Sequence, residues 1–369
     1  MNKHELLMQA LGGLLLAMLA GTTAFAFPHS DGSTFISATD ARIVYMGRVS
    51  HRIPDAVTFT YPGVSIFADF EGTSLRMQAK PGSGDFMVEI DDQLPYRISF
   101  TGQDSILTLA ESLPQGIHRA RLMYILEGYE LKPVFRGFYV DEGCTLAEAP
   151  VLPERRIEFI GNSITCGYGV ESNDKSDPFT YRTENHFYTY AARTAHALNA
   201  QHHAIARSGI GVYRNYGAPV SGSKDCMPAM YGQVMFTDST ELWDHSRYTP
   251  DVVCLNLGTN DTSENKYDVA LMEDAYRRFV AHLRDIYPQA KIVLLTGPMM
   301  NGRALEDVKR VLDTVAAERR LVGDVEVYRF DLSPQTGDLG YGANWHPSMR
   351  QQQKTANELT AYLKGLMKW

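Results

Sequence analysis

The chain has 369 residues, of which 44% are hydrophobic and 21% are charged, and its formal net charge at pH 7 is −8. This length predicts two domains, and the composition is that of a globular protein without a large disordered part. Because the chain is acidic overall, it offers no general basic field for phosphate backbones, and we expect no nucleic-acid partner.

The first 26 residues have the character of a signal peptide. Lys3 precedes an apolar stretch over residues 11–19, and small residues follow up to Ala26. A basic start, an apolar centre and a small-residue end are shared by export signals, and this centre is short for a membrane span. We expect cleavage after Ala26, a secreted or periplasmic protein, and no stable membrane insertion after cleavage. An uncleaved signal anchor is the alternative.

Residues 27–150 are expected to hold an all-β sandwich domain. Short apolar stretches are separated by glycines, and Phe86, Val88 and Ile90 alternate with residues of the opposite strand face. Such alternation, without a convincing amphipathic helix, is typical of antiparallel strands. Prolines in the segment 149–153 stiffen the connector and predict the domain boundary there.

In residues 151–369 predicted strands and helices alternate. Compact apolar runs indicate strands, and apolar residues at helical spacing indicate helices. The strands are expected at Arg156–Gly161, Asp251–Gly258, Lys291–Thr296 and Glu326–Asp331, and the helices at Asn185–Ala200, Asp268–Tyr287, Arg303–Val322 and Ser348–Lys368. This alternation predicts an α/β domain with a parallel sheet covered by helices on both faces.

Three polar motifs of this domain lie in loops that follow predicted strands. GNSIT comes directly after the first strand, GTND follows the second, and NWHPS lies between the last strand and the last helix. In open parallel sheets, ligands usually bind beyond the carboxyl ends of the strands. We therefore expect the three motifs to meet at one edge of the sheet.

Ser163 and His346 are the candidate catalytic pair within these motifs. A serine hydroxyl is a weak nucleophile until a base takes its proton, and imidazole is suited to that task near neutral pH. Attack on an ester also places negative charge on the carbonyl oxygen, which needs hydrogen-bond donors. The candidate donors are the backbone N–H groups of Ser163 and Gly209 and the side-chain amide of Asn260.

Most of these residues have a structural alternative. Ser163 can cap the helix that follows it, and Gly209 competes with Gly211 for the oxyanion role, although either glycine can serve only a tight turn. Asn260 and Asp261 can form a turn-and-cap pair, which is the role we prefer for Asp261 but not for Asn260.

In chain order, the segments GNSITCGYG, SGIGVYRNYG, LNLGTND and NWHPS resemble the motifs of the SGNH hydrolases, which are GDSL-like esterases. The closest resemblance is to the acetyl xylan esterases of carbohydrate esterase family two, over nearly the whole chain after the leader. It implies a jelly-roll sandwich followed by an SGNH hydrolase domain, with acetylated polysaccharide or oligosaccharide as substrate and no cofactor. By the same resemblance, Ser163 is the nucleophile, Gly209 and Asn260 complete the oxyanion hole, and His346 is the base.

Two departures from the family pattern concern the groups around the catalytic pair. Asn162 stands before the nucleophile, where aspartate is commoner, so that an amide replaces a carboxylate. Ala343 and Asn344 stand three and two residues before His346, where many relatives have an orienting aspartate. We hypothesise that a backbone carbonyl orients the histidine in a Ser–His dyad, with Asp338 as a remote substitute. A structural loop histidine is the alternative.

Aromatic residues beside the catalytic motifs are candidates for the substrate cleft. We expect Tyr213 and Trp345 there, because aromatic faces suit the C–H surface of a sugar ring, and Asn344 is a candidate for orientation or substrate contact. For Trp243 a buried packing role is an equal expectation. The histidines, including His202 and His203, lack the spacing of a metal site, so no metal is expected.

The leading hypothesis is an exported serine esterase that deacetylates xylan or related plant polysaccharides. A broader small-ester hydrolase or a sugar O-acetyltransferase would use the same groups and stays open. A non-catalytic carbohydrate-binding protein is the third alternative, which the missing aspartate favours and the retained serine, glycine, asparagine and histidine oppose. The sequence leaves the oligomeric state open.

Overall fold

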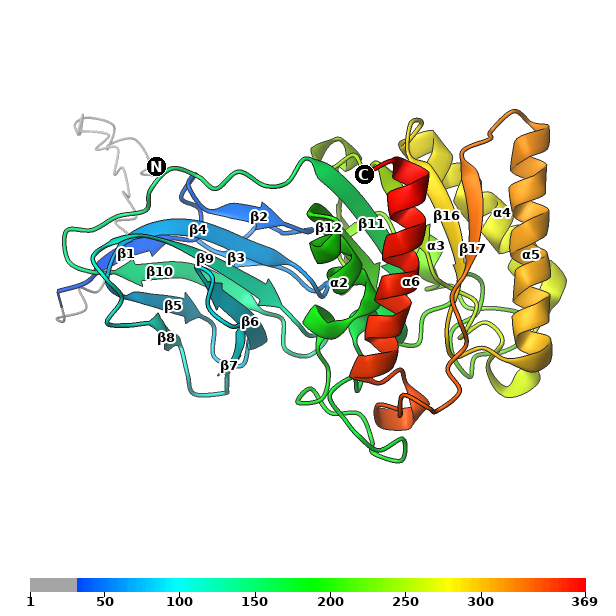
Figure 1. Ribbon diagram of the computed structural model, residues 1–369, viewed down its shortest axis with the longest axis horizontal. Helices are drawn as coiled ribbons and strands as arrows, with labels where there is room; N and C mark the ends of the chain where they lie inside the picture. The colour runs from blue at the N-terminus through cyan, green and yellow to red at the C-terminus, as the bar shows by residue number, and fades with distance from the viewer. Residues whose placement is uncertain (1–31) are drawn as a thin grey trace, which may run out of the picture. The chain divides into compact units, whose positions relative to one another are not determined.

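The computed structural model describes residues 32–369, which form a β-sandwich followed by an α/β domain (Figure 1). The expected leader over residues 1–26 lies outside the described residues. No helix between residues 32 and 369 combines the length and the apolar character that crossing a bilayer requires.

Two antiparallel five-stranded sheets form the sandwich, as expected for an all-β domain. The first sheet contains, in spatial order, β1 (Thr34–Ser37), β10 (Val134–Val140), β5 (Leu75–Ala79) and β8 (Ile106–Ala110), with β3 (Val57–Thr58) beside β10. The second contains β2 (Val44–Met46), β4 (Ser65–Gly72), β9 (Gly116–Tyr124), β6 (Gly84–Ile90) and β7 (Tyr96–Phe100). Phe86, Val88 and Ile90 are buried in the core of the sandwich, but Met87 is buried there as well, so the alternation in burial along this strand is incomplete.

The α/β domain is built on a five-stranded parallel sheet. Its spatial order is β12 (Ala200–Ala206), β11 (Arg155–Gly161), β15 (Val252–Leu255), β16 (Lys291–Thr296) and β17 (Val327–Asp331). The six α-helices assigned within residues 32–369 are α1 (Ser163–Cys166), α2 (Tyr190–Ala197), α3 (Met227–Met230), α4 (Val269–Ile286), α5 (Gly302–Leu321) and α6 (Met349–Met367). A small antiparallel hairpin of β13 (Gln233–Met235) and β14 (Asp238–Leu242) stands apart from this sheet.

Helices cover both faces of the parallel sheet, as predicted (Figure 1). Along β15, Val252 and Cys254 belong to the core shared with α2 and α6, whereas Val253 and Leu255 belong to the core shared with α4 and α5. The strand is apolar at every position because both of its faces are buried. Because β15 runs parallel to β11 and β16, the loops that follow the carboxyl ends of these strands lie at the same edge of the sheet.

The segment around residues 185–206 differs from its prediction. Helical spacing predicts one helix over Asn185–Ala200, but the structure has a 3₁₀ turn at His186–Tyr188, helix α2, and then strand β12 at the edge of the sheet. The strand escaped detection because its sequence AQHHAIA carries two histidines in the middle of an apolar run. Both histidine side chains are buried, at 1% and 4% exposure.

Arg48, which follows β2 of the sandwich, is buried against the α/β domain. Its guanidinium donates to the backbone carbonyls of Tyr231 and of Gln233, the latter at 2.9 Å. It also lies 3.6 Å from the carboxylate of Glu158 on β11 and 5.4 Å from the centre of the Trp243 ring. The sandwich therefore inserts a buried cation into the α/β domain.

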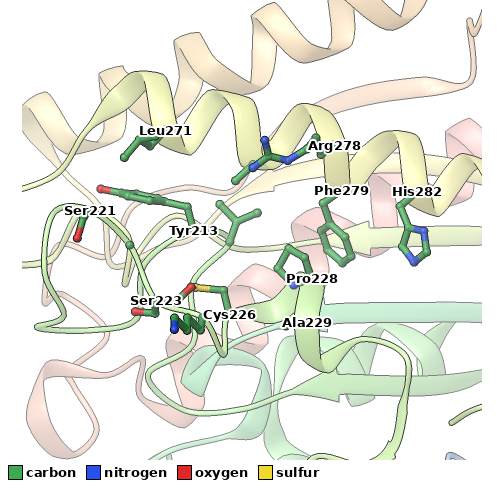
Figure 2. A pocket seen from close by; sticks show the side chains of 14 residues that line it. Tyr213, Ser221, Ser223, Cys226, Pro228, Ala229, Leu271, Arg278, Phe279 and His282 are labelled. Atoms are coloured by element: carbon green, nitrogen blue, oxygen red, sulfur yellow. The ribbon is translucent and has the colours of Figure 1, made fainter. Parts of the chain in front are cut away.

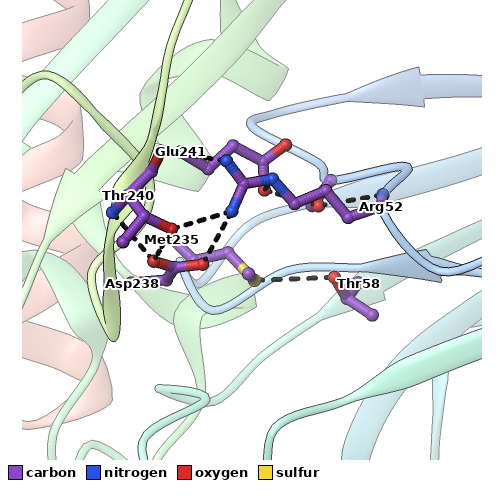
Figure 3. A network of polar contacts seen from close by, with 7 residues as sticks. Arg52, Thr58, Met235, Asp238, Thr240 and Glu241 are labelled. Atoms are coloured by element: carbon purple, nitrogen blue, oxygen red, sulfur yellow. Dashed lines mark hydrogen bonds and ion pairs between the residues drawn. The ribbon is translucent and has the colours of Figure 1, made fainter.

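A second, more exposed network joins the same two halves through the β13–β14 hairpin (Figure 3). Arg52 donates to Thr240 Oγ1 at 2.8 Å and forms ion pairs with Asp238 at 3.2 Å and Glu241 at 3.3 Å. Because half of the arginine side chain is exposed, we expect this network to contribute less to stability than the buried Arg48 site.

Candidate active site

Ser163 stands at the end of β11, where the strand turns into the short helix α1. Asn162 caps this helix, because its Oδ1 accepts a hydrogen bond from the backbone N–H of Ile164 at 3.1 Å. The buried Nδ2 of Asn162 has no hydrogen-bond partner among the described residues. The amide therefore preserves the capping contact, and Ser163, as the first helical residue, keeps a backbone N–H without an intrahelical acceptor.

His346 reaches Ser163 from the loop before α6. Its Nε2 lies 2.8 Å from Ser163 Oγ, although the two residues are 183 positions apart in the sequence. The structure thus brings together the two side chains that the sequence nominated as nucleophile and base. This separation is within the range that direct proton transfer requires.

Two backbone carbonyls face the other nitrogen of the imidazole. Nδ1 of His346 is 3.1 Å from the carbonyl oxygen of Ala343 and 3.1 Å from that of Asn344. Because carbonyl oxygens only accept hydrogen bonds, Nδ1 carries the proton and Nε2 is left free to accept from the serine hydroxyl. The carboxylate of Asp338 instead accepts from Thr336 Oγ1.

A strained turn holds these carbonyls in place. Asn344 has φ +47° and Trp345 has φ +62°, both in the left-handed region. Asparagine tolerates this region, whereas a bulky aromatic residue rarely adopts it. The segment 175–177 fixes the turn, since its carbonyls accept from the N–H groups of Asn344 at 3.1 Å and Trp345 at 3.3 Å.

Tyr168 forms a wall of the site that the sequence did not single out. Its ring stacks on His346, with centroids 4.1 Å apart and an interplanar angle of 26°, and on Phe179 with centroids 4.4 Å apart. Its hydroxyl accepts a hydrogen bond from Asn344 Nδ2 at 2.7 Å.

Burial lowers the pKa of His346 from 6.5 to about 4, and the two carbonyls at Nδ1 act in the opposite direction. Part of the His346 side chain still reaches solvent.

Asn260 anchors the segment that carries Gly209. Its Nδ2 donates to the carbonyl of Ile210 at 2.8 Å, which uses one of the two amide hydrogens and leaves the other for an oxyanion. Gly209 has φ +76°, and no atom lies within 4 Å of where its Cβ would be. By contrast, Gly211 donates its N–H to Asn215 Oδ1 at 3.2 Å, which favours Gly209 of the two glycines.

Asp261 has the structural role preferred for it. Its buried carboxylate accepts hydrogen bonds from the backbone N–H groups of Val212 at 2.9 Å, Tyr213 at 2.8 Å and Gly258 at 3.1 Å. Burial raises the pKa of this carboxyl. Asp261 therefore joins the GTND loop to the segment that follows Gly211.

The aromatic candidates are placed in different surroundings. Trp345 is 52% exposed, and Lys175 Nζ lies 4.1 Å from the centre of its ring. Trp243 is buried beside Arg48. Tyr213 is also buried, and its hydroxyl accepts a hydrogen bond from the N–H of Asp268 at 2.8 Å. Of the three, Trp345 alone combines exposure with a position next to His346.

Tyr213 lines a cavity of about 720 Å³ beside α4, and neither Ser163 nor His346 belongs to its lining (Figure 2). Leu271, Arg278, Phe279 and His282 of α4 form one side of this cavity (Figure 2).

Tyr216 is an exposed aromatic residue that the sequence analysis did not single out. Its side chain is 66% exposed, and its N–H donates to the carbonyl of Gly209 at 2.8 Å. Its place seven residues after Gly209 was the only available signal.

Between residues 32 and 369, no group of three or more histidine, cysteine, aspartate or glutamate side chains is arranged to hold a metal ion. Cys144, Cys166, Cys226 and Cys254 are free thiols in this structure.

Comparison with known families assigns both halves of the chain. Residues 45–150 match the family described as Carbohydrate esterase 2 N-terminal, and residues 159–354 match the GDSL-like Lipase/Acylhydrolase family. The cellulase/esterase CelE of Acetivibrio thermocellus is 36% identical over 89% of this chain, which spans 40% of the length of CelE. An acetylxylan esterase / glucomannan deacetylase of Cellvibrio japonicus is 32% identical over 90% of this chain and 91% of its own length.

Solved structures give the same assignment. A family two carbohydrate esterase from Clostridium thermocellum in complex with cellohexaose has a TM-score of 0.81 and 36% identity, covering 89% of this chain and 99% of its own. A family two carbohydrate esterase from Cellvibrio japonicus has a TM-score of 0.82 and 29% identity, covering 91% and 98%. The chain therefore belongs to the GDSL-like lipase/acylhydrolase family and, within it, to the carbohydrate esterases of family two.

Proposed function

We propose that this carbohydrate esterase is an exported enzyme that removes O-acetyl groups from xylan or related plant polysaccharides, with Ser163 as nucleophile and His346 as base. The 2.8 Å separation between Ser163 Oγ and His346 Nε2 is the observation that carries the proposal. The leader-like residues 1–26 support export.

In the acylation step, Ser163 Oγ attacks the acetyl carbonyl carbon while its proton moves to Nε2 of His346. The carbonyl oxygen becomes an anion, which the N–H groups of Ser163 and Gly209 and the free amide hydrogen of Asn260 stabilise. One such donor is worth about 2.7–4 kcal/mol of transition-state stabilisation. As the intermediate collapses, the sugar oxygen leaves and takes the proton from Nε2, and the acetyl group stays on Ser163.

In the deacylation step, water replaces the sugar. Nε2 of His346 takes a proton from the water as its oxygen attacks the acetyl carbon, and the same donors hold the second oxyanion. When this intermediate collapses, the proton returns to Ser163 Oγ and acetic acid leaves. The net reaction consumes one ester and one water and produces one sugar hydroxyl and acetic acid, with no external oxidant or reductant.

The carbonyls of Ala343 and Asn344 take the place of an orienting carboxylate. In the serine-protease template, the aspartate holds the imidazole in the tautomer that leaves Nε2 free and stabilises the imidazolium. Two carbonyls at 3.1 Å from Nδ1 support the same tautomer and present partial negative charge to the cation that forms. The Tyr168 ring, stacked on the imidazole, adds a second attraction for that cation.

A polysaccharide substrate is supported by the surface around the dyad and by the relatives. Trp345 and Tyr216 are 52% and 66% exposed, and both are joined through the backbone to catalytic segments. Relatives that align over most of this chain carry the name acetylxylan esterase / glucomannan deacetylase. We infer that the two aromatic side chains flank the reacting sugar and hold it by its C–H faces.

Acetate release from acetylated xylan by the wild type and by Ser163→Ala tests the proposal. We expect the variant to lose turnover of xylan and of an activated aryl acetate while it keeps its unfolding temperature. Retained activity in Ser163→Ala would overturn the nucleophile assignment. Hydrolysis of the aryl acetate without acetate release from xylan would leave a broader small-ester hydrolase, and acetyl transfer to an added acceptor sugar would identify an acetyltransferase.

A further inference from the structure

Glu127, from the sandwich half, binds Ser208, the residue next to the proposed oxyanion glycine Gly209. Glu127 follows strand β9 and is 3% exposed. Its Oε1 accepts the N–H of Ser208 at 2.6 Å, and its Oε2 accepts the hydroxyl of the same serine. Ser208 directly precedes Gly209, so this two-point contact determines how the Gly209 peptide is presented to the site.

The loop that carries Glu127 is fixed on both sides. The N–H of Gly128 donates to the carbonyl of Thr60 in the sandwich at 2.9 Å. The N–H of Glu127 donates to Oε2 of Glu184, in the segment before α2, at 3.2 Å. The backbone at Glu127 is therefore anchored by a main-chain contact within the sandwich and by the side chain of Glu184 from the α/β domain.

The two carboxyl groups form a buried acidic pair. Glu184 is fully buried, its Oε1 has no hydrogen-bond partner among the described residues, and Arg97, the cation that acts on it electrostatically, is bound to Asp85 and Glu171. Two buried carboxylates without a cation bound to them are strongly disfavoured. Burial and the neighbouring Glu127 raise the pKa of Glu184 well above its ordinary value.

Cys166 completes the cluster from the nucleophile side. This residue of α1 is buried, and burial, together with the charge of Glu127, raises the pKa of its thiol, which therefore stays protonated. The cluster thus contacts the helix that begins at Ser163, the segment that carries Gly209, and the sandwich. All three must keep their spacing for the oxyanion hole to fit a tetrahedral intermediate.

We propose that Glu127 is a positioning residue for the oxyanion hole, supplied by the β-sandwich, and that the buried carboxyl of Glu184, whose Oε1 has no hydrogen-bond partner among the described residues, supports it as a neutral group. The inference rests on the proposed function of Ser163 and Gly209. It gives the sandwich a part in catalysis besides its packing against the hydrolase half.

Kinetics of Glu127→Ala and Glu127→Gln on an aryl acetate test the positioning role. We expect Glu127→Ala to lower kcat about 10- to 100-fold with little change in KM, because displaced donors weaken the transition state more than the ground state. Glu127→Gln should recover most of this loss, since its amide oxygen can accept the Ser208 N–H and its nitrogen can donate to the Ser208 hydroxyl. Arg52→Ala is the matched control, because it weakens contact between the same two halves away from Ser208.

Two outcomes would overturn the positioning role. One is a Glu127→Ala enzyme with unchanged kcat and only a lower unfolding temperature, like Arg52→Ala, while Ser163→Ala remains inactive. The other is unchanged amide hydrogen exchange at Ser208 and Gly209 in Glu127→Ala, where we expect faster exchange than in Arg52→Ala. Because exchange needs no turnover, it separates a failure of this inference from a failure of the proposed function.

Glu184→Gln tests the proton on the second carboxyl. Glutamine imitates the neutral acid, so we expect kcat to stay near the wild-type value and a buried carboxylic-acid band to disappear from the infrared spectrum at neutral pH. A large loss of kcat without loss of that band would contradict a protonated Glu184.

Discussion

Tyr168 and His346 stack face to face, with ring centroids 4.1 Å apart. Tyr168 lies five residues after the nucleophile, so the helix that begins at Ser163 leads into the ring that supports the base. In the proposed acylation step, the imidazole becomes a cation directly over this ring. The electron-rich face of the Tyr168 ring then supplies part of the stabilisation of the imidazolium that a carboxylate gives in a Ser-His-Asp triad.

Replacing Tyr168 by leucine should therefore slow the chemical step. A cation–π contact of about 0.5–2 kcal/mol corresponds to roughly a 2- to 30-fold lower kcat. Tyr168→Phe keeps the stacked ring and loses only the hydrogen bond from Asn344, so its kcat should lie closer to the wild type. Steady-state kinetics on an aryl acetate check the order. A phenylalanine variant as slow as the leucine variant would assign the effect to the hydroxyl instead.

Substitution of the Asn344 side chain should have a modest effect, because the contact with His346 is made by its backbone carbonyl. Asn344→Asp adds a carboxyl group and keeps a residue that tolerates positive φ, so its rate should change little. Asn344→Ala loses the bond to Tyr168, which costs at most about 10-fold if one ordinary hydrogen bond is lost. Complete inactivity of a folded Asn344→Ala enzyme, checked by kcat and circular dichroism, would make the amide a catalytic participant.

The pH profile should report the shifted pKa of His346. The base must be neutral, and its pKa is lowered to about 4 from the ordinary 6.5. The acid limb of kcat/KM should therefore have its midpoint nearer 4 than 6.5. The same shift affects stability. Between about pH 6.5 and 4 the unfolded chain binds a proton at His346 that the folded protein does not bind, so the free energy of unfolding decreases as the pH falls through this range. An acid limb centred at 6.5 would show that solvent reaches the ring freely.

Local patterns were sufficient to predict the sandwich, the parallel sheet and the loops that carry Ser163 and His346, but not the edge strand β12. Strand β15 reads as an uninterrupted apolar run because helices cover both of its faces, and GNSIT, GTND and NWHPS stand where loops follow strands. The carboxyl ends of parallel strands lie at one edge, so the sequence predicts that Ser163 and His346 lie close together.

The sequence led to the hypothesis that a backbone carbonyl orients His346, but it did not reveal which carbonyls face the ring or what holds them in place. The positive φ of Trp345 and the direction of the Ala343 carbonyl depend on hydrogen bonds to the segment 175–177, which no spacing in the sequence reveals. Glu127 lies 81 residues from Ser208 and in the other half of the chain. Tyr213 was expected at the cleft because of its neighbours, yet its side chain points to the cavity beside α4 (Figure 2).

Loss of the Asn260 amide should impair the transition state. Removal of one oxyanion donor lowers kcat by about 10²–10³-fold, and Asn260→Ala should fall in this range with a smaller change in KM. Asn215→Ala is the matched control. It removes an amide that binds Gly211 and Asp225 within the segment that carries Gly209, and not in the GTND loop of Asn260. Equal losses of kcat in the two variants would mean that loop order, not oxyanion stabilisation, explains the effect.

Arg48 should dominate the stability of the contact between the two halves. Arg48→Met leaves Glu158 buried without its cation, and breaking a buried pair costs about 3–5 kcal/mol of unfolding free energy. The pKa of Glu158 is already raised by burial, and it should rise further in the variant, so the loss should be smaller at pH 5 than at pH 8. The double variant Arg48→Met/Glu158→Leu removes both charges and should recover part of the stability.

Urea unfolding of the two variants at both pH values measures these differences, and Arg52→Ala provides the exposed control, for which we expect about 1 kcal/mol or less. A pH-independent loss in Arg48→Met would mean that the ring contacts and the two carbonyls bound by the guanidinium, not the charge of Glu158, determine the effect. If the double variant were less stable than Arg48→Met, the hydrogen bond from the Tyr231 hydroxyl to Glu158 would be the dominant contribution of that carboxyl group.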